Sequence, residues 1–192
     1  MSTVKDSATQ RNRIHPKKFA LYVSFASILM MFAGLTSAYI VRQAAGNWLE
    51  FRLPSMFFVS TAIILLSSAT LHFAYQAFLN GNEKGYKGLL VLSLLLGFGF
   101  MITQYLGWEQ LTAIGVDLKG NPAGSFVYLL TGLHVAHVLG GVGAIAVATM
   151  HAFGLKYKVT PVRKLRFELT NQYWHFVDLL WVYLLVFMLF QR

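Results

Sequence analysis

Two short segments carry most of the side chains that could do chemistry. The first holds His134 and His137, which are three residues apart and therefore lie on neighbouring parts of one helix face. The second is the run YWHFVD at 173–178, in which an aspartate follows a histidine by three residues. Imidazole binds metal ions and also carries protons near neutral pH, so both segments are candidate sites.

These segments lie within long apolar stretches. Of the 192 residues, 56% are hydrophobic and 12% are charged, against about 25% charged in ordinary soluble domains. Only one of the 23 charged residues, Asp178, lies inside the stretches. They cover residues 19–41, 53–82, 88–108, 120–155 and 169–191. About 20 apolar residues cross a bilayer, and these runs are continuous rather than alternating. The pattern predicts an all-α integral membrane protein with five transmembrane helices, and it excludes a soluble enzyme and a β-barrel.

The domain organisation is simple. We predict a basic tail over residues 1–18 and one transmembrane domain over residues 19–192. The predicted helices cover about residues 19–41, 55–79, 88–108, 126–150 and 170–190. The first apolar run starts too late and is too long for a signal peptide, so we expect no cleavable leader. Cysteine is absent, which excludes disulfides, iron–sulfur clusters and thiolate metal sites.

The net charge of +9 is explained by membrane topology. With a cytoplasmic N-terminus, 12 of the 16 Lys and Arg residues fall in cytoplasmic segments and 4 fall in periplasmic ones. The positive-inside rule therefore predicts a cytoplasmic N-terminus and a periplasmic C-terminus. The basic excess suits contact with anionic lipid, and we expect no nucleic acid partner.

Helix depth suggests a polar cluster inside the bundle. At 1.5 Å per residue, Asp178 lies about 12 Å and His72 about 10 Å from the cytoplasmic ends of their helices. A lone carboxylate in a span costs about 2.5–3.5 kcal/mol, so Asp178 needs a partner, and His175 is the nearest candidate. By depth, His72, His137, Glu168 and Asp178 could form one cluster in the cytoplasmic half. The full set of candidate residues for a buried polar cluster is His72, His134, His137, Glu168, Trp174, His175 and Asp178.

Three interpretations of this cluster remain open. In the first, the polar side chains satisfy one another between helices. In the second, the chain acts alone as a membrane haem or di-metal oxidoreductase that uses His72, His134, His137 and His175. In the third, the ionisable groups form a proton path or collect protons at its mouth. The chain carries no phosphate-binding loop and no Ser-His-Asp set, so it offers no other catalytic motif.

The last two helices resemble subunit III of haem–copper respiratory oxidases, the cytochrome c oxidase subunit 3 family. The shared features are Thr131-Gly132 followed by His134, His137 and Val138, then Phe167-Glu168, the run 173–178 and Trp181. His72 and the pair Gln104 and Trp108 fit weaker positions of the family. The resemblance covers essentially residues 15–192.

Two departures from the family accompany this resemblance. The mitochondrial-type subunit has seven helices, whereas this chain resembles the short five-helix bacterial form that lacks the first two. The lipid-holding cleft beside those two helices would then be incomplete, or another subunit would complete it. The family also has a buried glutamate in the span that matches the first helix, but residues 25–30 contain no carboxylate. A functional role that depends on that glutamate in the family cannot therefore be assigned to this chain.

The resemblance implies a subunit with no catalytic residue, metal or cofactor of its own. The haems and copper are expected in subunit I, which is the main expected contact, and a further copper in subunit II of cytochrome c oxidases. Small or supercomplex subunits are further expected partners. The family's role implies a multi-pass protein of the bacterial inner membrane that binds structural phospholipid and supports proton uptake and enzyme stability. The electron donor, cytochrome c or quinol, stays open.

Overall fold

A computed structural model describes residues 15–191, and every regular element in that part is an α-helix. The helices are α2 (Pro16–Ala44), α3 (Ser55–Leu79), α4 (Glu83–Ala113), α5 (Pro122–Gly154) and α6 (Pro161–Phe190). All five are long and apolar enough to cross a bilayer. The fold is therefore the all-α membrane bundle that the apolar runs predict.

All of the described helices except α3 extend beyond their predicted bounds. Pro122 begins α5 and Pro161 begins α6, where a residue without an amide hydrogen costs no hydrogen bond. The side chain of Asn121 accepts a hydrogen bond from the amide of Ala123 (2.9 Å), and Thr160 caps α6 in the same way. Consequently α6 starts well before residue 170, and α2 starts inside the predicted tail. Residues 1–14 of that tail lie outside the described residues.

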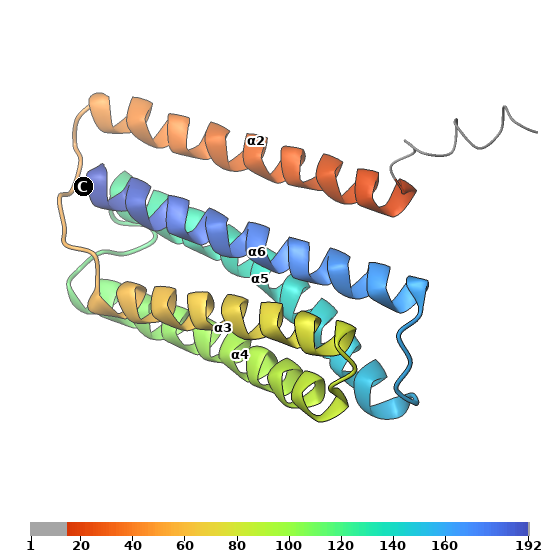
Figure 1. Ribbon diagram of the computed structural model, residues 1–192. Coiled ribbons are helices and arrows are strands. Elements are labelled where there is room, and N and C mark those ends of the chain that lie inside the picture. The colour runs from red at the N-terminus through yellow and green to blue at the C-terminus, as the bar shows by residue number, and fades with distance from the viewer. Residues whose placement is uncertain (1–14, 192) are drawn as a thin grey trace, which may run out of the picture.

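Four of the helices form a closed ring around one core. In chain order α3, α4, α5 and α6 each pack against the next, and α6 returns to α3 (Figure 1). The closest pair is the α3–α4 hairpin, whose turn contains Gly81 at φ 79°, a conformation that favours glycine. Large side chains with almost no exposed surface fill the ring, among them Phe57, Phe100, Trp174 and Trp181. This core positions the candidate residues of α5 and α6.

The remaining helix, α2, lies outside the ring and, among the described helices, packs only against α5 and α6 (Figure 1). A second, smaller core joins the three helices and contains Phe32, Tyr39, Leu130, Leu180 and Leu184. Only 11% of the most apolar window of α2 is buried, against 44% in α6. An apolar helix that is exposed on most of its surface fits contact with lipid or with another protein.

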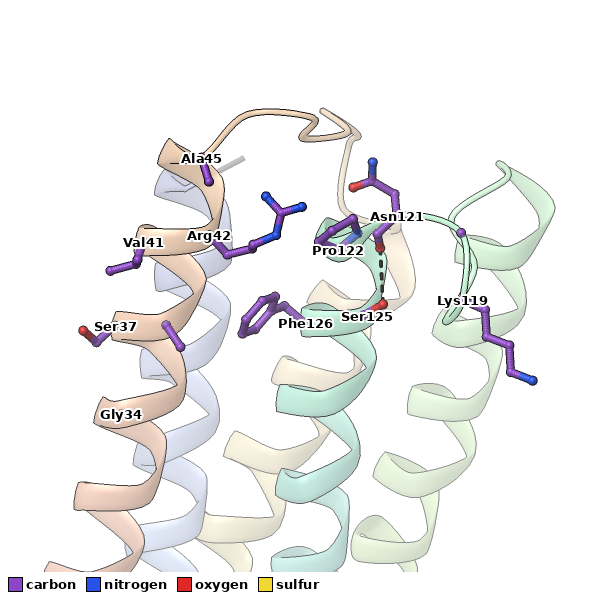
Figure 2. Close-up of a pocket in the computed structure, with 12 residues that line it drawn as sticks. Gly34, Ser37, Val41, Arg42, Ala45, Lys119, Asn121, Pro122, Ser125 and Phe126 are labelled. Carbon is purple, nitrogen blue, oxygen red and sulfur yellow. Dashed lines mark hydrogen bonds between the residues drawn. The ribbon is translucent and has the colours of Figure 1, made fainter.

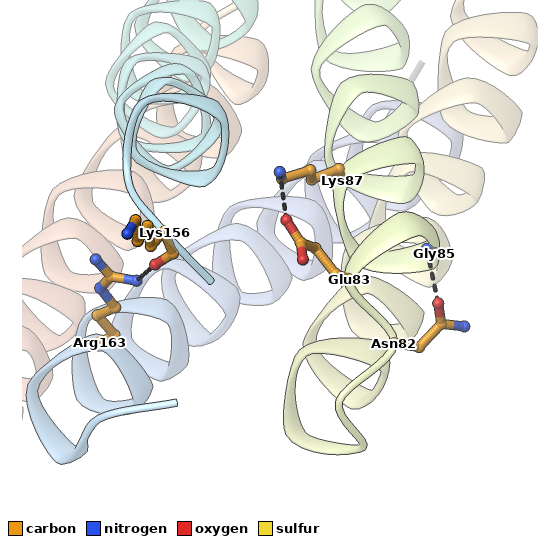
Figure 3. A network of polar contacts seen from close by, with 6 residues as sticks. All are labelled: Asn82, Glu83, Gly85, Lys87, Lys156 and Arg163. Carbon is orange, nitrogen blue, oxygen red and sulfur yellow. Dashed lines mark hydrogen bonds and ion pairs between the residues drawn. The ribbon is translucent and has the colours of Figure 1, made fainter. Parts of the chain in front are cut away.

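The two ends of the bundle differ in charge. We call the end with the start of α2, the α3–α4 turn and the α5–α6 connection the basic end. Its polar network includes the ion pair Lys87–Glu83 (2.6 Å) and a hydrogen bond from Arg163 to the carbonyl of Lys156 (2.8 Å) (Figure 3). The other end, which we call the opposite end, holds the α2–α3 and α4–α5 loops and, in the described chain, only three cationic side chains: Arg42, Arg52 and Lys119.

Candidate functional site

The structure distributes the seven candidate residues over three helices. His72 is on α3, His134 and His137 are on α5, and the other four are on α6: Glu168, Trp174, His175 and Asp178. Their contacts fall into three groups rather than the one cluster expected from depth. The depth of a residue in the membrane was insufficient to predict these contacts, because it does not give the direction in which a side chain points around its helix axis.

The first group is an ion pair at the basic end. Nζ of Lys18 on α2 and Oε1 of Glu168 on α6 are 2.5 Å apart. The side chains are 29% and 26% exposed, and pairs near the surface contribute only about 0.2–1 kcal/mol. Because α2 packs less extensively than the other helices, even this small term helps to hold the start of α2 against α6.

The second group is a polar row that runs inward from the surface of α3. Nδ1 of His175 and Oγ of Ser68 are joined by a hydrogen bond of 2.5 Å. The ring of His72 lies 5.9 Å from that of His175, centre to centre, and its Nε2 accepts a hydrogen bond from Gln76 (2.9 Å). His72 and Gln76 are exposed, whereas His175 is half-buried. The row therefore joins α3 to α6 and leaves polar groups on the surface of a membrane helix.

Asp178 lies one turn further along α6 and is buried. The expected ion pair with His175 is absent among the described residues, because His175 is directed to Ser68 instead. Oδ1 of Asp178 has no hydrogen-bond partner within residues 15–191. The expected contact within one helix is thus replaced by a contact between two helices.

The third group consists of the two histidines of α5, which contact aromatic rings. His134 has no exposed surface and lies between Phe100 and Trp181, with ring-centre distances of 5.8 and 5.1 Å. Neither of its ring nitrogens has a partner in the described chain. Nδ1 of His137 donates a hydrogen bond to the carbonyl of Leu133 (2.7 Å), and its ring contacts Phe32 of α2. Both side chains are therefore part of the helix packing.

Trp174 occupies a space made by two glycines. A Cβ atom at Gly141 would lie 2.7 Å from Cε3 of Trp174, and one at Gly97 would lie 3.2 Å from its Cη2. These glycines allow the indole ring to fit between α4 and α5. The sequence alone did not predict this role of the two glycines, although glycine inside an apolar helix is a signal for close packing.

Further hydrogen bonds between helices were also missed. The donors and acceptors are Trp108 to Thr131 (3.0 Å), Gln104 to Ser60 (2.9 Å) and Trp181 to Thr61 (2.8 Å). A buried indole N–H or amide needs an acceptor, which is the signal that could have revealed them. Serine and threonine in helices often form hydrogen bonds to the backbone of their own helix. Their hydroxyls were therefore not predicted to accept hydrogen bonds from other helices.

The arrangement does not fit a di-metal centre. Within residues 15–191, no group of three or more His, Cys, Asp or Glu side chains is placed to hold a metal ion. Such a site needs several ligands that converge on one point, whereas these side chains diverge into three groups. Their observed contacts instead join α2 to α6, α3 to α6 and α5 to its neighbours. These contacts and the exposed apolar helices define an integral membrane protein whose helices are joined by apolar cores and by polar contacts.

Comparison with known proteins identifies the family. Residues 49–191 match the family model of cytochrome c oxidase subunit III. The chain is 31% identical to cytochrome c oxidase subunit 3 of Corynebacterium diphtheriae, over 91% of this chain and 88% of that protein. It is also 31% identical to the probable cytochrome c oxidase subunit 3 of Nocardia farcinica, over 100% of this chain and 98% of that protein. The chain belongs to the cytochrome c oxidase subunit III family.

A vertebrate relative is matched over a smaller part. Cytochrome c oxidase subunit 3 of Gallus gallus is 32% identical over 66% of this chain, and the match covers 46% of the chicken protein. The chain thus corresponds to nearly the whole length of the bacterial relatives and to less than half of the chicken protein. The family model begins at residue 49, so it covers the four-helix ring and not α2.

Proposed function

We propose that this chain works only within an assembled oxidase, as a subunit without a redox centre of its own, and that its main partner is subunit I. The family implies a multi-subunit complex, and the bacterial relatives favour the bacterial inner membrane. Haems and copper belong to the partner subunits in this proposal. The chain contributes binding of phospholipid, support of proton uptake and stability of the complex.

The observation that carries the proposal is the polar surface of α3. His72 and Gln76 are exposed on a helix that spans the membrane, and His175 lies beside them. Polar side chains that face lipid hydrocarbon are unfavourable, and such side chains normally face protein or a water-filled cavity. We therefore propose that this face of α3 and α6 contacts subunit I.

Replacing the two exposed polar side chains tests this interface. The double variant H72L/Q76L suits a lipid environment and leaves the His175–Ser68 hydrogen bond in place. We expect normal insertion of the variant into the membrane but a several-fold loss of haem-bearing oxidase recovered with a tagged chain. The variant H151L is the control, because His151 is an exposed histidine elsewhere on the bundle. Equal recovery with H72L/Q76L and H151L would exclude this face as the interface.

We also propose that the basic end faces the cytoplasm. The charge difference between the two ends of the bundle supports this orientation through the positive-inside rule. The N-terminal end of α2 is then cytoplasmic and the C-terminal end of α6 is periplasmic. Lysines and arginines of the basic end, with Glu168 and the row that leads to His175, are the groups that we assign to support of proton uptake.

A further inference from the structure

A pocket of about 810 Å³ lies at the opposite end, between α2 and the start of α5 (Figure 2). Its lining combines small and apolar side chains with two cations, Arg42 and Lys119. No carboxylate lines it among the described residues. It is separate from the three groups of candidate residues, none of which contributes to its lining.

Arg42 is the central polar group of this pocket. Its side chain is half-buried and extends into the space between α2 and the start of α5, whereas Lys119 extends outward from the loop (Figure 2). Within residues 15–191 the guanidinium makes one hydrogen bond, from Nη1 to the carbonyl of Gly46 (3.1 Å), and no ion pair. Because a guanidinium has five N–H donors, most of its donors stay available for an anion. Its planar geometry suits the oxygens of a phosphate group.

The position of Arg42 along α2 matches the headgroup level of a bilayer. The helix has 29 residues and is about 43 Å long at 1.5 Å per residue. A bilayer with its headgroup regions is about 40–45 Å thick, so a helix that starts at one surface ends at the other. Arg42 is in the last turn of α2 and therefore lies where lipid phosphates are found.

Below Arg42 the lining of the pocket consists of small and mostly apolar side chains, with Ser37 as the one hydroxyl from α2. Gly34, Ala38 and Val41 lie along α2 over about two turns, and Phe126 lines the pocket from α5. Gly34 and Arg42 are eight positions apart, which corresponds to about 12 Å along the helix. This path leads from the headgroup level towards the middle of the membrane and fits the upper part of an acyl chain.

We propose that this pocket binds one anionic phospholipid of the leaflet at the opposite end, with its phosphate at Arg42 and an acyl chain along α2. Lys119 at the rim adds positive charge for the headgroup. The unpaired cation, the depth and the apolar path together favour a lipid over a helix of another protein. The inference extends the lipid binding of the proposed function to a defined place.

Lipid retention by the purified oxidase tests the site. The complex is washed with detergent, incubated with mixed micelles of phosphatidylglycerol or phosphatidylcholine, and bound lipid is counted per haem by mass spectrometry. We expect R42Q to retain phosphatidylglycerol at this site about fivefold less well than the wild type, as expected for one surface cation. R52Q, which removes an exposed arginine outside the pocket at the same end, should retain as much as the wild type. Phosphatidylcholine and inorganic phosphate should not replace the lost lipid.

A cross-linking experiment identifies the occupant without removing Arg42. The chain has no cysteine, so A38C introduces a single attachment point within it for a photoactivatable label. We expect mainly adducts with phospholipid. Adducts with another subunit, displacement of the lipid by inorganic phosphate, or equal retention in R42Q and R52Q would each overturn the proposal. Haem that co-purifies with R42Q would show that the oxidase is assembled, which separates failure of this site from failure of the proposed function.

Discussion

At the scale of single residues, the close packing of the Trp174 ring against Gly141 is important for the stability of the helix bundle. The variant G141A places a methyl group 2.7 Å from the indole ring, so the ring or a helix must shift. Overpacking of this kind costs about 1–3 kcal/mol. We expect G141A to lower the thermal unfolding temperature of the detergent-solubilised protein relative to G143A.

G143A is a matched control on the same helix. A Cβ atom at Gly143 meets nothing within 4 Å, and the exchange from glycine to alanine is the same in both variants. Alanine has a higher helix propensity than glycine, and this gain in stability is therefore the same in G141A and G143A. If the two variants unfolded at the same temperature, the Trp174 contact would not have the importance that we give it.

The sequence predicted the residue types of the site but not their partners. His175 and Asp178 are three residues apart, and this spacing suggested a pair within α6. In the structure, the rotation of α6 against α3 turns His175 to Ser68. Such a partner comes from another helix, and a single sequence carries no information about which faces of two helices meet.

At the scale of helices, the attachment of α2 is the weakest part of the bundle. Its apolar surface is mostly exposed, and the Lys18–Glu168 ion pair joins its first turns to α6. We expect E168Q to increase hydrogen exchange of backbone amides in the first turns of α2, while exchange in α3 and α4 stays unchanged. The effect should be modest, because such a pair contributes about 0.2–1 kcal/mol.

The variant E83Q provides the control for this measurement. It breaks the Lys87–Glu83 pair, which lies within α4 and joins no second helix. Exchange in α2 should not respond to E83Q. An equal response of α2 to both variants, or none to E168Q, would contradict a role of Glu168 in holding α2.

Hydropathy predicted which helices exist better than where they end. The apolar runs predicted five helices correctly, but only the bounds of α3. Hydropathy detects the part of a helix that lies in the hydrocarbon of the bilayer and not the turns that extend beyond it. The first turns of α6 carry Arg163, Lys164 and Arg166 and therefore look like a loop by hydropathy. They are helical because Thr160 and Pro161 start the helix outside the apolar run.

At the scale of the whole molecule, the charge difference between the two ends predicts the orientation. Single cysteines can be placed in the cysteine-free chain at Glu50, in the α2–α3 loop, and at Lys84, near the α3–α4 turn. We expect a membrane-impermeant maleimide to label E50C in right-side-out membrane vesicles and K84C in inside-out vesicles. The reverse pattern would contradict a cytoplasmic basic end.

The central claim is that the chain acts as one subunit of an oxidase and holds no redox centre itself. Its most direct test is purification of the tagged chain in mild detergent, followed by an absorption spectrum and metal analysis before and after dissociation of the complex. We predict haem bands and a large haem-bearing subunit in the intact preparation, and neither haem nor bound metal in the dissociated chain. Stoichiometric haem, iron or copper that stays with the isolated chain and is lost in H72A, H134A, H137A or H175A would contradict the claim.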